Sequence, residues 1–203
     1  MASATEPQRQ MSAGTHSAAE PGKIEAAYAS RTVALVGLMG AGKSTVGRRL
    51  AAALGRKFFD SDAEIEEAAG LSIPDIFTIH GEAEFRRGEC KVLERLLSYK
   101  PHVLATGGGA YMNPDTRVLM REKAVTIWLS ADLDTLWRRV SKRGHRPLLK
   151  SDNPKGVLAR LFKERAPVYS EADIIIKSVD GPHSDTVDAI IEALKGWKPP
   201  EDA

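Results

Sequence analysis

Gly37-Leu38-Met39-Gly40-Ala41-Gly42-Lys43-Ser44 is the stretch that decides the fold of this chain. It fits the pattern G-x-x-x-x-G-K-[ST], in which backbone N–H groups wrap a polyphosphate. The apolar run 32–36 before it predicts a buried strand, and residues 45–54 after it predict a helix. We therefore expect a phosphate-binding loop in which Lys43 reaches the β- and γ-phosphates and Ser44 binds Mg²⁺. The alternative is a glycine-rich turn that ends in Lys-Ser by chance.

Composition limits the classes of partner. The 203 residues include 29 Lys and Arg against 27 Asp and Glu, so charge gives no case for a nucleic-acid partner. Cys90 is the single cysteine, which excludes an internal disulfide and a thiolate metal site and fits a cytoplasmic protein. No apolar stretch approaches the ~20 residues that a membrane helix needs.

The two ends of the chain differ from its middle. Residues 1–30 are rich in Ala, Ser, Thr, Glu, Gln, Pro and Gly and offer little to bury, so we expect a flexible extension. They resemble neither a secretory signal nor a transit peptide. We expect a single domain over residues 31–197 and a short loose tail over 198–203.

Strands and helices alternate along the predicted domain. Five apolar runs predict strands, at 32–36, 57–60, 102–105, 124–129 and 173–177. Helical patterns separate them, at 45–54, 63–69, 72–79, 82–99, 114–121, 132–143, 154–169 and 184–194. This alternation predicts an α/β fold with a mostly parallel sheet covered on both faces. Ligands bind at the carboxyl ends of such strands, so we expect the phosphate loop and the segments after the second and third strands at one edge.

The segment Phe59-Asp60-Ser61-Asp62 ends the second predicted strand. Two carboxylates two residues apart on an extended chain point the same way. One could hold Mg²⁺ or its waters while the other accepts a bond from a substrate hydroxyl. The alternative is that Asp62 caps the following helix.

Three further segments hold candidate ligand groups. Arg86 and Glu89 lie three residues apart on one predicted helix, which suits either an arginine fork for a ligand carboxylate or a solvated ion pair. The run Thr106-Gly107-Gly108-Gly109-Ala110 follows a strand and allows a ligand to approach backbone N–H groups closely; the alternative is a flexible turn. The basic segment 142–150 suits a lid that brings an arginine onto the γ-phosphate, or a charged surface loop.

Taken together, these segments resemble the shikimate kinase family over about residues 31–180. The motifs that carry the resemblance stand in the family's order: Gly37 to Thr45, Phe59-Asp60-Ser61-Asp62, Gly81-Glu82 with Phe85-Arg86-Arg87, Gly107-Gly108-Gly109-Ala110, Arg146-Pro147-Leu148-Leu149, and Arg165-Ala166-Pro167-Val168-Tyr169. The resemblance implies a three-layer α/β/α P-loop fold with strand order 2-3-1-4-5 and a mobile lid at about 143–155. It also implies transfer of the γ-phosphoryl group of ATP to the 3-hydroxyl of shikimate, on the route to aromatic amino acids.

The same resemblance implies roles for individual residues. Asp62 would contact the shikimate hydroxyls, Arg86 and Arg165 would grip the carboxylate, and Glu89 would orient Arg86. The backbone of Gly107, Gly108 and Gly109 would line the substrate site, with Gly108 as a donor. Ser44 would ligate Mg²⁺ directly, with Asp60 acting through water. The expected ATP contacts are Gly40, Ala41, Gly42, Lys43, Ser44, Thr45, Arg139 and Arg146, with Arg139 beside the adenine.

These roles lead to specific expectations. We expect Lys43, Asp62 and Arg146 to be the catalytic groups, ATP and Mg²⁺ to be required, and the protein to be a cytoplasmic monomer without a nucleic-acid or membrane partner. The alternatives are another small-metabolite kinase of the same fold, such as one for gluconate, and a nucleotide-binding module that has lost catalysis.

Overall fold

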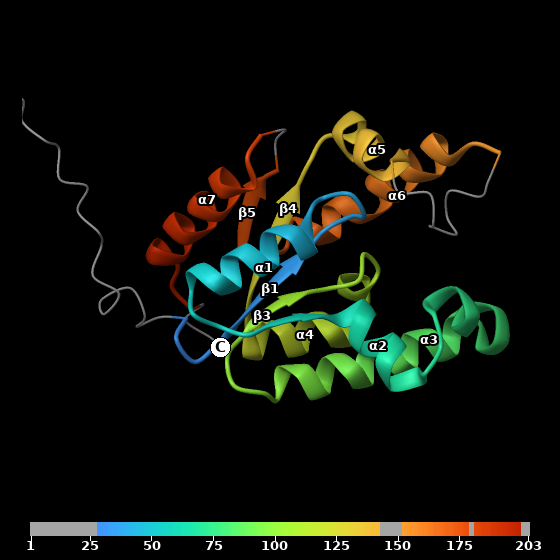
Figure 1. Ribbon diagram of the computed structural model, residues 1–203, viewed down its shortest axis with the longest axis horizontal. Helices are drawn as coiled ribbons and strands as arrows, with labels where there is room; N and C mark the ends of the chain where they lie inside the picture. The colour runs from blue at the N-terminus through green and yellow to red at the C-terminus, as the bar shows by residue number, and fades with distance from the viewer. Residues whose placement is uncertain (1–27, 143–151, 179–180, 200–203) are drawn as a thin grey trace, which may run out of the picture.

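The computed structural model describes residues 28–142, 152–178 and 181–199. They form an α/β fold around one five-stranded parallel sheet (Figure 1). The strands are β1 (Thr32–Val36), β2 (Phe58–Asp60), β3 (Val103–Ala105), β4 (Ala124–Ser130) and β5 (Ile174–Lys177). Their order is β2-β3-β1-β4-β5, which confirms the predicted fold class and strand order.

Seven α-helices and a short 3₁₀ helix are present among the described residues. They are α1 (Lys43–Ala53), α2 (Ser61–Ala69), α3 (Ile73–Leu97), η1 (Ala110–Met112), α4 (Pro114–Lys123), α5 (Leu133–Ser141), α6 (Pro154–Tyr169) and α7 (His183–Gly196). Two predicted helices form the one element α3, but its backbone breaks at Gly81, with φ 78°. The predicted boundary near Gly81 is therefore a real kink.

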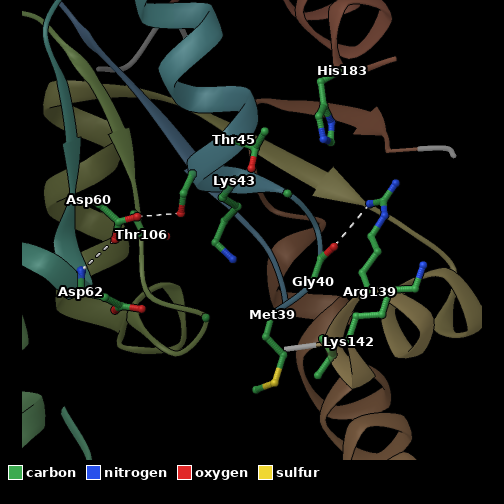
Figure 2. A pocket seen from close by; sticks show the side chains of 14 residues that line it. Met39, Gly40, Lys43, Thr45, Asp60, Asp62, Thr106, Arg139, Lys142 and His183 are labelled. Atoms are coloured by element: carbon green, nitrogen blue, oxygen red, sulfur yellow. Dashed lines mark hydrogen bonds between the residues drawn. The ribbon is translucent and has the colours of Figure 1, made fainter. Parts of the chain in front are cut away.

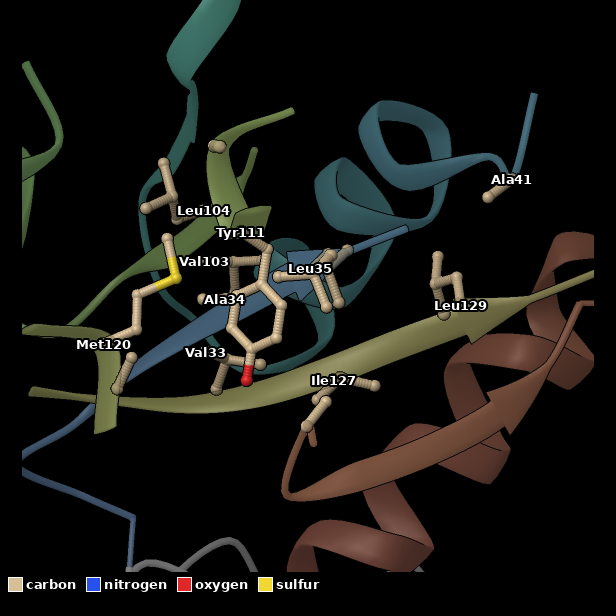
Figure 3. Packing of buried hydrophobic residues seen from close by; sticks show 14 of the residues in the cluster. Val33, Ala34, Leu35, Ala41, Val103, Leu104, Tyr111, Met120, Ile127 and Leu129 are labelled. Atoms are coloured by element: carbon tan, nitrogen blue, oxygen red, sulfur yellow. The ribbon is translucent and has the colours of Figure 1, made fainter. Parts of the chain in front are cut away.

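The sheet is covered on both faces. Helices α1 and α7 pack against each other over one face, and α4 lies on the opposite side of β1 and β3 from α1 (Figure 1). All five residues of β1 are buried, as a central parallel strand requires. Side chains from β1, β3 and β4 form the middle of the core with Met120 of α4 and Tyr111 of η1 (Figure 3).

The domain begins earlier than the sequence predicted. Tyr28 is buried, and the Arg56 guanidinium lies 5.0 Å from the centre of its ring. The Tyr28 carbonyl also accepts a bond from the Arg31 N–H at 3.0 Å. Residues 28–30 therefore belong with the folded part, while residues 1–27 lie outside the described range.

The parallel arrangement brings all five carboxyl strand ends to one edge of the sheet. The phosphate loop follows β1, Asp60 ends β2, and the triple glycine follows β3. The predicted lid lies mostly outside the described residues, because only 152–155 of its range are described. Among the described helices, none combines the length and apolar character that crossing a bilayer requires.

Candidate active site

The loop between β1 and α1 has the conformation of a phosphate-binding loop. Gly40 has a φ of +84°, and a Cβ there would lie 2.7 Å from Cγ2 of Val140 and 3.0 Å from the Leu136 carbonyl oxygen. Only glycine fits such a position without strain. Helix α1 starts at Lys43, so its first backbone N–H groups face the mouth of the loop.

The Lys43 side chain folds back over this loop. Its Nζ donates to the carbonyl oxygens of Gly37 at 2.6 Å and Leu38 at 3.0 Å. Figure 2 shows the ammonium between the two aspartates on one side and Arg139 on the other. A cation in this place can neutralise charge on the terminal phosphates of a nucleotide.

Ser44, Asp60 and Asp62 are linked at the end of β2. The Ser44 hydroxyl donates to Oδ2 of Asp60 at 2.6 Å, and Oδ1 of Asp60 accepts from the Asp62 N–H at 3.2 Å. Asp60 therefore caps α2, and the predicted alternative of Asp62 as the cap is wrong. The extended geometry predicted for the pair is also wrong, because Asp62 lies inside α2.

The triple glycine packs directly against charged side chains. A Cβ on Gly107 would lie 2.5 Å from Oδ1 of Asp62, and one on Gly109 would lie 2.5 Å from Nη1 of Arg86. Any larger residue would displace these groups. The turn is thus a cradle for Asp62 and Arg86, and the alternative of a merely flexible turn does not account for this packing.

Arg165 reaches the same turn from α6. Its Nη1 donates to the Gly108 carbonyl oxygen at 2.9 Å. Gly108 was predicted to act as a backbone donor to substrate; the structure shows its carbonyl as an acceptor for Arg165. Two guanidinium groups that are 79 positions apart in sequence, those of Arg86 and Arg165, therefore lie beside one three-residue turn.

Glu89 forms a buried ion pair with Arg86. Its Oε2 lies 2.7 Å from Nη1 of Arg86, and its side chain is only 3% exposed. The alternative of a solvated ion pair is therefore wrong for this carboxylate. Burial raises the pKa of Glu89, and the hydrogen bond and charge of Arg86 oppose that rise. Nη2 of Arg86 also contacts Glu82 at 3.3 Å.

A cavity of about 300 Å³ opens over the phosphate loop. Asp60 and Asp62 lie on one side of it and Arg139 and His183 on the other (Figure 2). The rest of its lining is Met39, Gly40, Gly42, Lys43, Ser44, Thr45, Thr106, Gly108, Val140 and Lys142. Of the predicted ATP contacts, Ala41 is buried within the loop and does not line the cavity, and Arg146 lies outside the described residues.

Comparisons with known proteins agree with this geometry. The sequence profile described as "Shikimate kinase" matches residues 39–195. A shikimate kinase of Rhodopseudomonas palustris is 54% identical over 175 residues, covering 86% of each chain. One of Bradyrhizobium diazoefficiens is 54% identical over 172 residues, covering 85% of this chain and 83% of the relative. The solved structure of the shikimate kinase of Acinetobacter baumannii in complex with shikimate is 41% identical in sequence, with a TM-score of 0.78. That match covers 81% of this chain and 92% of the solved one.

This chain belongs to the shikimate kinase family. It is an ATP-dependent phosphotransferase and carries the activity of that family. A gluconokinase of Sinorhizobium meliloti is 19% identical with a TM-score of 0.52, so that likeness shows the fold alone.

The structure places the predicted ATP contact Arg139 at the cavity and adds two residues that sequence reasoning did not assign, Ser178 and His183. Nη1 of Arg139 donates to the Gly40 carbonyl at 3.3 Å and to the Ser178 hydroxyl at 2.9 Å, and Ser178 in turn donates to the Ala41 carbonyl. Burial lowers the pKa of Arg139. His183 lines the far wall of the cavity, where burial and then the charges of Arg49 and Arg139 lower its pKa. No local pattern marks His183, because a single histidine at the start of a helix carries no ligand spacing that would distinguish it from a surface residue.

Proposed function

We propose that this site transfers the γ-phosphoryl group of ATP to the 3-hydroxyl of shikimate, with Arg86, Arg165 and Asp62 holding the acceptor. One observation carries the proposal. Two arginines and an aspartate from three different helices meet at the triple glycine, next to the phosphate-loop cavity. That arrangement suits a small molecule with one carboxylate and several hydroxyls.

The two arginines have the geometry of a carboxylate clamp. A guanidinium is planar and offers paired N–H donors that match a carboxylate. Glu89 orients the Arg86 guanidinium, and the Gly108 carbonyl orients that of Arg165. Both guanidinium groups are therefore in place before substrate binds. Prepositioned donors lose less conformational freedom on binding, which favours affinity.

Asp62 and Lys43 act at the reacting end of the acceptor. Asp62 lines the cavity beside Gly107, where its carboxylate can accept a hydrogen bond from the attacking hydroxyl. Lys43 takes up charge on the transferred group. Because the transition state of phosphoryl transfer is loose, positioning and charge neutralisation contribute more than proton removal does.

Residues that fit Mg²⁺ are present. The Ser44 hydroxyl lies 2.6 Å from Asp60 Oδ2, and hard oxygen ligands of this kind are what Mg²⁺ prefers. Among the described residues, no three His, Cys, Asp or Glu side chains gather as a metal group, so the phosphates and water would complete the shell. Bound Mg²⁺ would neutralise charge on the β- and γ-phosphates. Ser44 would bind it directly, and Asp60 would hold a water ligand.

Asp62→Asn is the test of the proposal. The amide keeps the shape but lacks the negative charge that orients the attacking hydroxyl, so we expect kcat to fall about 100-fold or more while the KM for ATP changes little. Asp188→Asn, on the exposed side of α7, is the control and should leave both unchanged. Equal losses in turnover and in ATP affinity would show that Asp62 supports the fold or the nucleotide and not the acceptor.

A further inference from the structure

Tyr169, the last residue of α6, has no part in the roles given so far. It is 1% exposed, although it ends a helix next to the active site. Its hydroxyl donates to the Gly108 carbonyl oxygen, the same atom that accepts the 2.9 Å bond from Arg165. One carbonyl of the triple glycine thus holds both a tyrosine and an arginine.

The two side chains reach this carbonyl from the same helix. Arg165 and Tyr169 lie four residues apart on α6, on one face of the helix, and both donate to the Gly108 carbonyl oxygen. Removing the hydroxyl would leave that carbonyl with one fewer donor, and Arg165 bound to a less firmly held acceptor.

The Tyr169 ring packs against two other aromatic rings. Its centroid lies 5.9 Å from that of Trp128 and 6.4 Å from that of Tyr111, with interplanar angles of 27° and 16°. Trp128 in turn backs the phosphate loop, because a Cβ on Gly37 would lie 3.2 Å from its Cδ1. The ring that carries the hydroxyl is therefore packed within a row of aromatic side chains that extends to the phosphate loop.

Burial raises the pKa of Tyr169 to about 12, so its hydroxyl stays protonated and remains a donor at neutral pH. The bond from this hydroxyl to the Gly108 carbonyl is therefore available at neutral pH.

We propose that Tyr169 is a positioning residue for the substrate: its hydroxyl fixes the Gly108 carbonyl and with it the Arg165 guanidinium that grips the acceptor carboxylate. This inference rests on the proposed function, in which Arg165 binds that carboxylate. It concerns affinity for the acceptor and not the chemical step. Loss of the hydroxyl should therefore act on the KM for shikimate and leave the nucleotide site alone.

Tyr169→Phe is the direct test, because it keeps the stacked ring and deletes one oxygen. We expect the KM for shikimate to rise about fivefold, as loss of one neutral hydrogen bond would give, with the KM for ATP changed less than about twofold. Tyr111→Phe is the matched control. Tyr111 is also buried and stacked on Tyr169, and removal of its hydroxyl leaves the bond between Tyr169 and Gly108 intact. An equal rise in the control would overturn the inference, since it would reflect packing alone.

Arg165→Lys, alone and combined with Tyr169→Phe, separates this inference from the proposed function. If Tyr169 acts through Arg165, the double variant should show a rise in the KM for shikimate well below the product of the two single rises. Rises that multiply would contradict action through Arg165. A higher KM for shikimate in Arg165→Lys, with an unchanged KM in Tyr169→Phe, would overturn the inference and leave the proposed function standing. An unchanged KM for shikimate in Arg165→Lys would overturn the carboxylate clamp itself, and the role of Tyr169 with it.

Discussion

The Arg86 guanidinium lies flat against the backbone of Gly109, so that a Cβ on Gly109 would stand 2.5 Å from Nη1, 2.7 Å from Nη2 and 2.9 Å from Cζ. Oε2 of Glu89 accepts a hydrogen bond from Nη1 of the same guanidinium at 2.7 Å. The fork is thus fixed between a buried carboxylate and a residue without a side chain. Its position depends on that missing side chain as much as on its ion pair.

Gly109→Ala should therefore weaken substrate binding specifically. The added methyl group would push Arg86 aside, and we expect the KM for shikimate to rise at least about tenfold, since a misplaced clamp loses orientation as well as contact. The KM for ATP should stay within about twofold. Steady-state kinetics with each substrate varied in turn measures both.

Gly88→Ala provides the control for that variant. Gly88 lies in α3 near Arg86, but nothing stands within 4 Å of its Cβ position. Alanine favours a helix over glycine by about 1 kcal/mol, so this variant should be slightly more stable and fully active. A normal KM for shikimate in Gly109→Ala would mean that the carboxylate is bound elsewhere.

Ser44→Ala tests the assignment of the metal site. Loss of the hydroxyl should raise the Mg²⁺ concentration that gives half-maximal activity by about tenfold, because one direct oxygen ligand is gone. Asp60→Asn should shift it less, because Asp60 would act through a water. Titration of activity with Mg²⁺ at fixed ATP compares the two, and a larger shift in Asp60→Asn would reverse the assignment. Removal of Mg²⁺ with EDTA should abolish turnover in all variants.

His102 should make stability depend on pH. It is 0% exposed, and its Nε2 has no hydrogen-bond partner among the described residues. Burial lowers the pKa of His102 below 6.5, so the folded state keeps the ring neutral while the unfolded chain takes up a proton. The stabilisation is complete above about pH 6.5 and is lost as the pH falls towards the lowered pKa.

His102→Gln should remove that dependence. In urea unfolding between about pH 6.5 and 5.5, the free energy of unfolding of the parent chain should fall more steeply than that of the variant, by up to about 1.4 kcal/mol per pH unit. Parallel curves over this range would mean that His102 is charged in the folded state as well.

Tyr28 should contribute to stability although it precedes the predicted domain. Its ring is 3% exposed beneath Arg56, and truncating a buried aromatic side chain costs about 3 kcal/mol. We expect Tyr28→Ala to lower the free energy of unfolding by that amount without changing either KM. Tyr99→Ala is the control: Tyr99 is 42% exposed, so its loss should cost about 1 kcal/mol. If Tyr28→Ala lowered the free energy of unfolding only as much as Tyr99→Ala does, Tyr28 would lie outside the part of the chain that unfolds cooperatively.

Local signals in the sequence predicted much of the fold. The phosphate loop, the five strands and the break at Gly81 follow from glycines and apolar runs that act within a few residues. The order of the strands came from the family resemblance, since no local pattern encodes it. The cap at Asp60 was missed because a carboxylate two residues before another can cap a helix or line a site, and only the backbone distinguishes the two.

The active site was harder to predict than the fold because its parts are distant in sequence. Nothing near Arg165 indicates that it meets Gly108, 57 positions away, or that Tyr169 shares the same carbonyl. The burial of Glu89 likewise depends on packing between α3 and the triple glycine and not on the i, i+3 pattern. Such contacts become visible only when the helices are placed around the sheet.

ADP release by the full chain with Mg²⁺-ATP, measured without acceptor, with shikimate and with gluconate, tests the central claim most directly. The site described here predicts strong stimulation by shikimate and none by gluconate. Stimulation by gluconate, or none by shikimate while ATP still binds, would contradict the assignment of Arg86, Arg165 and Asp62 to that acceptor.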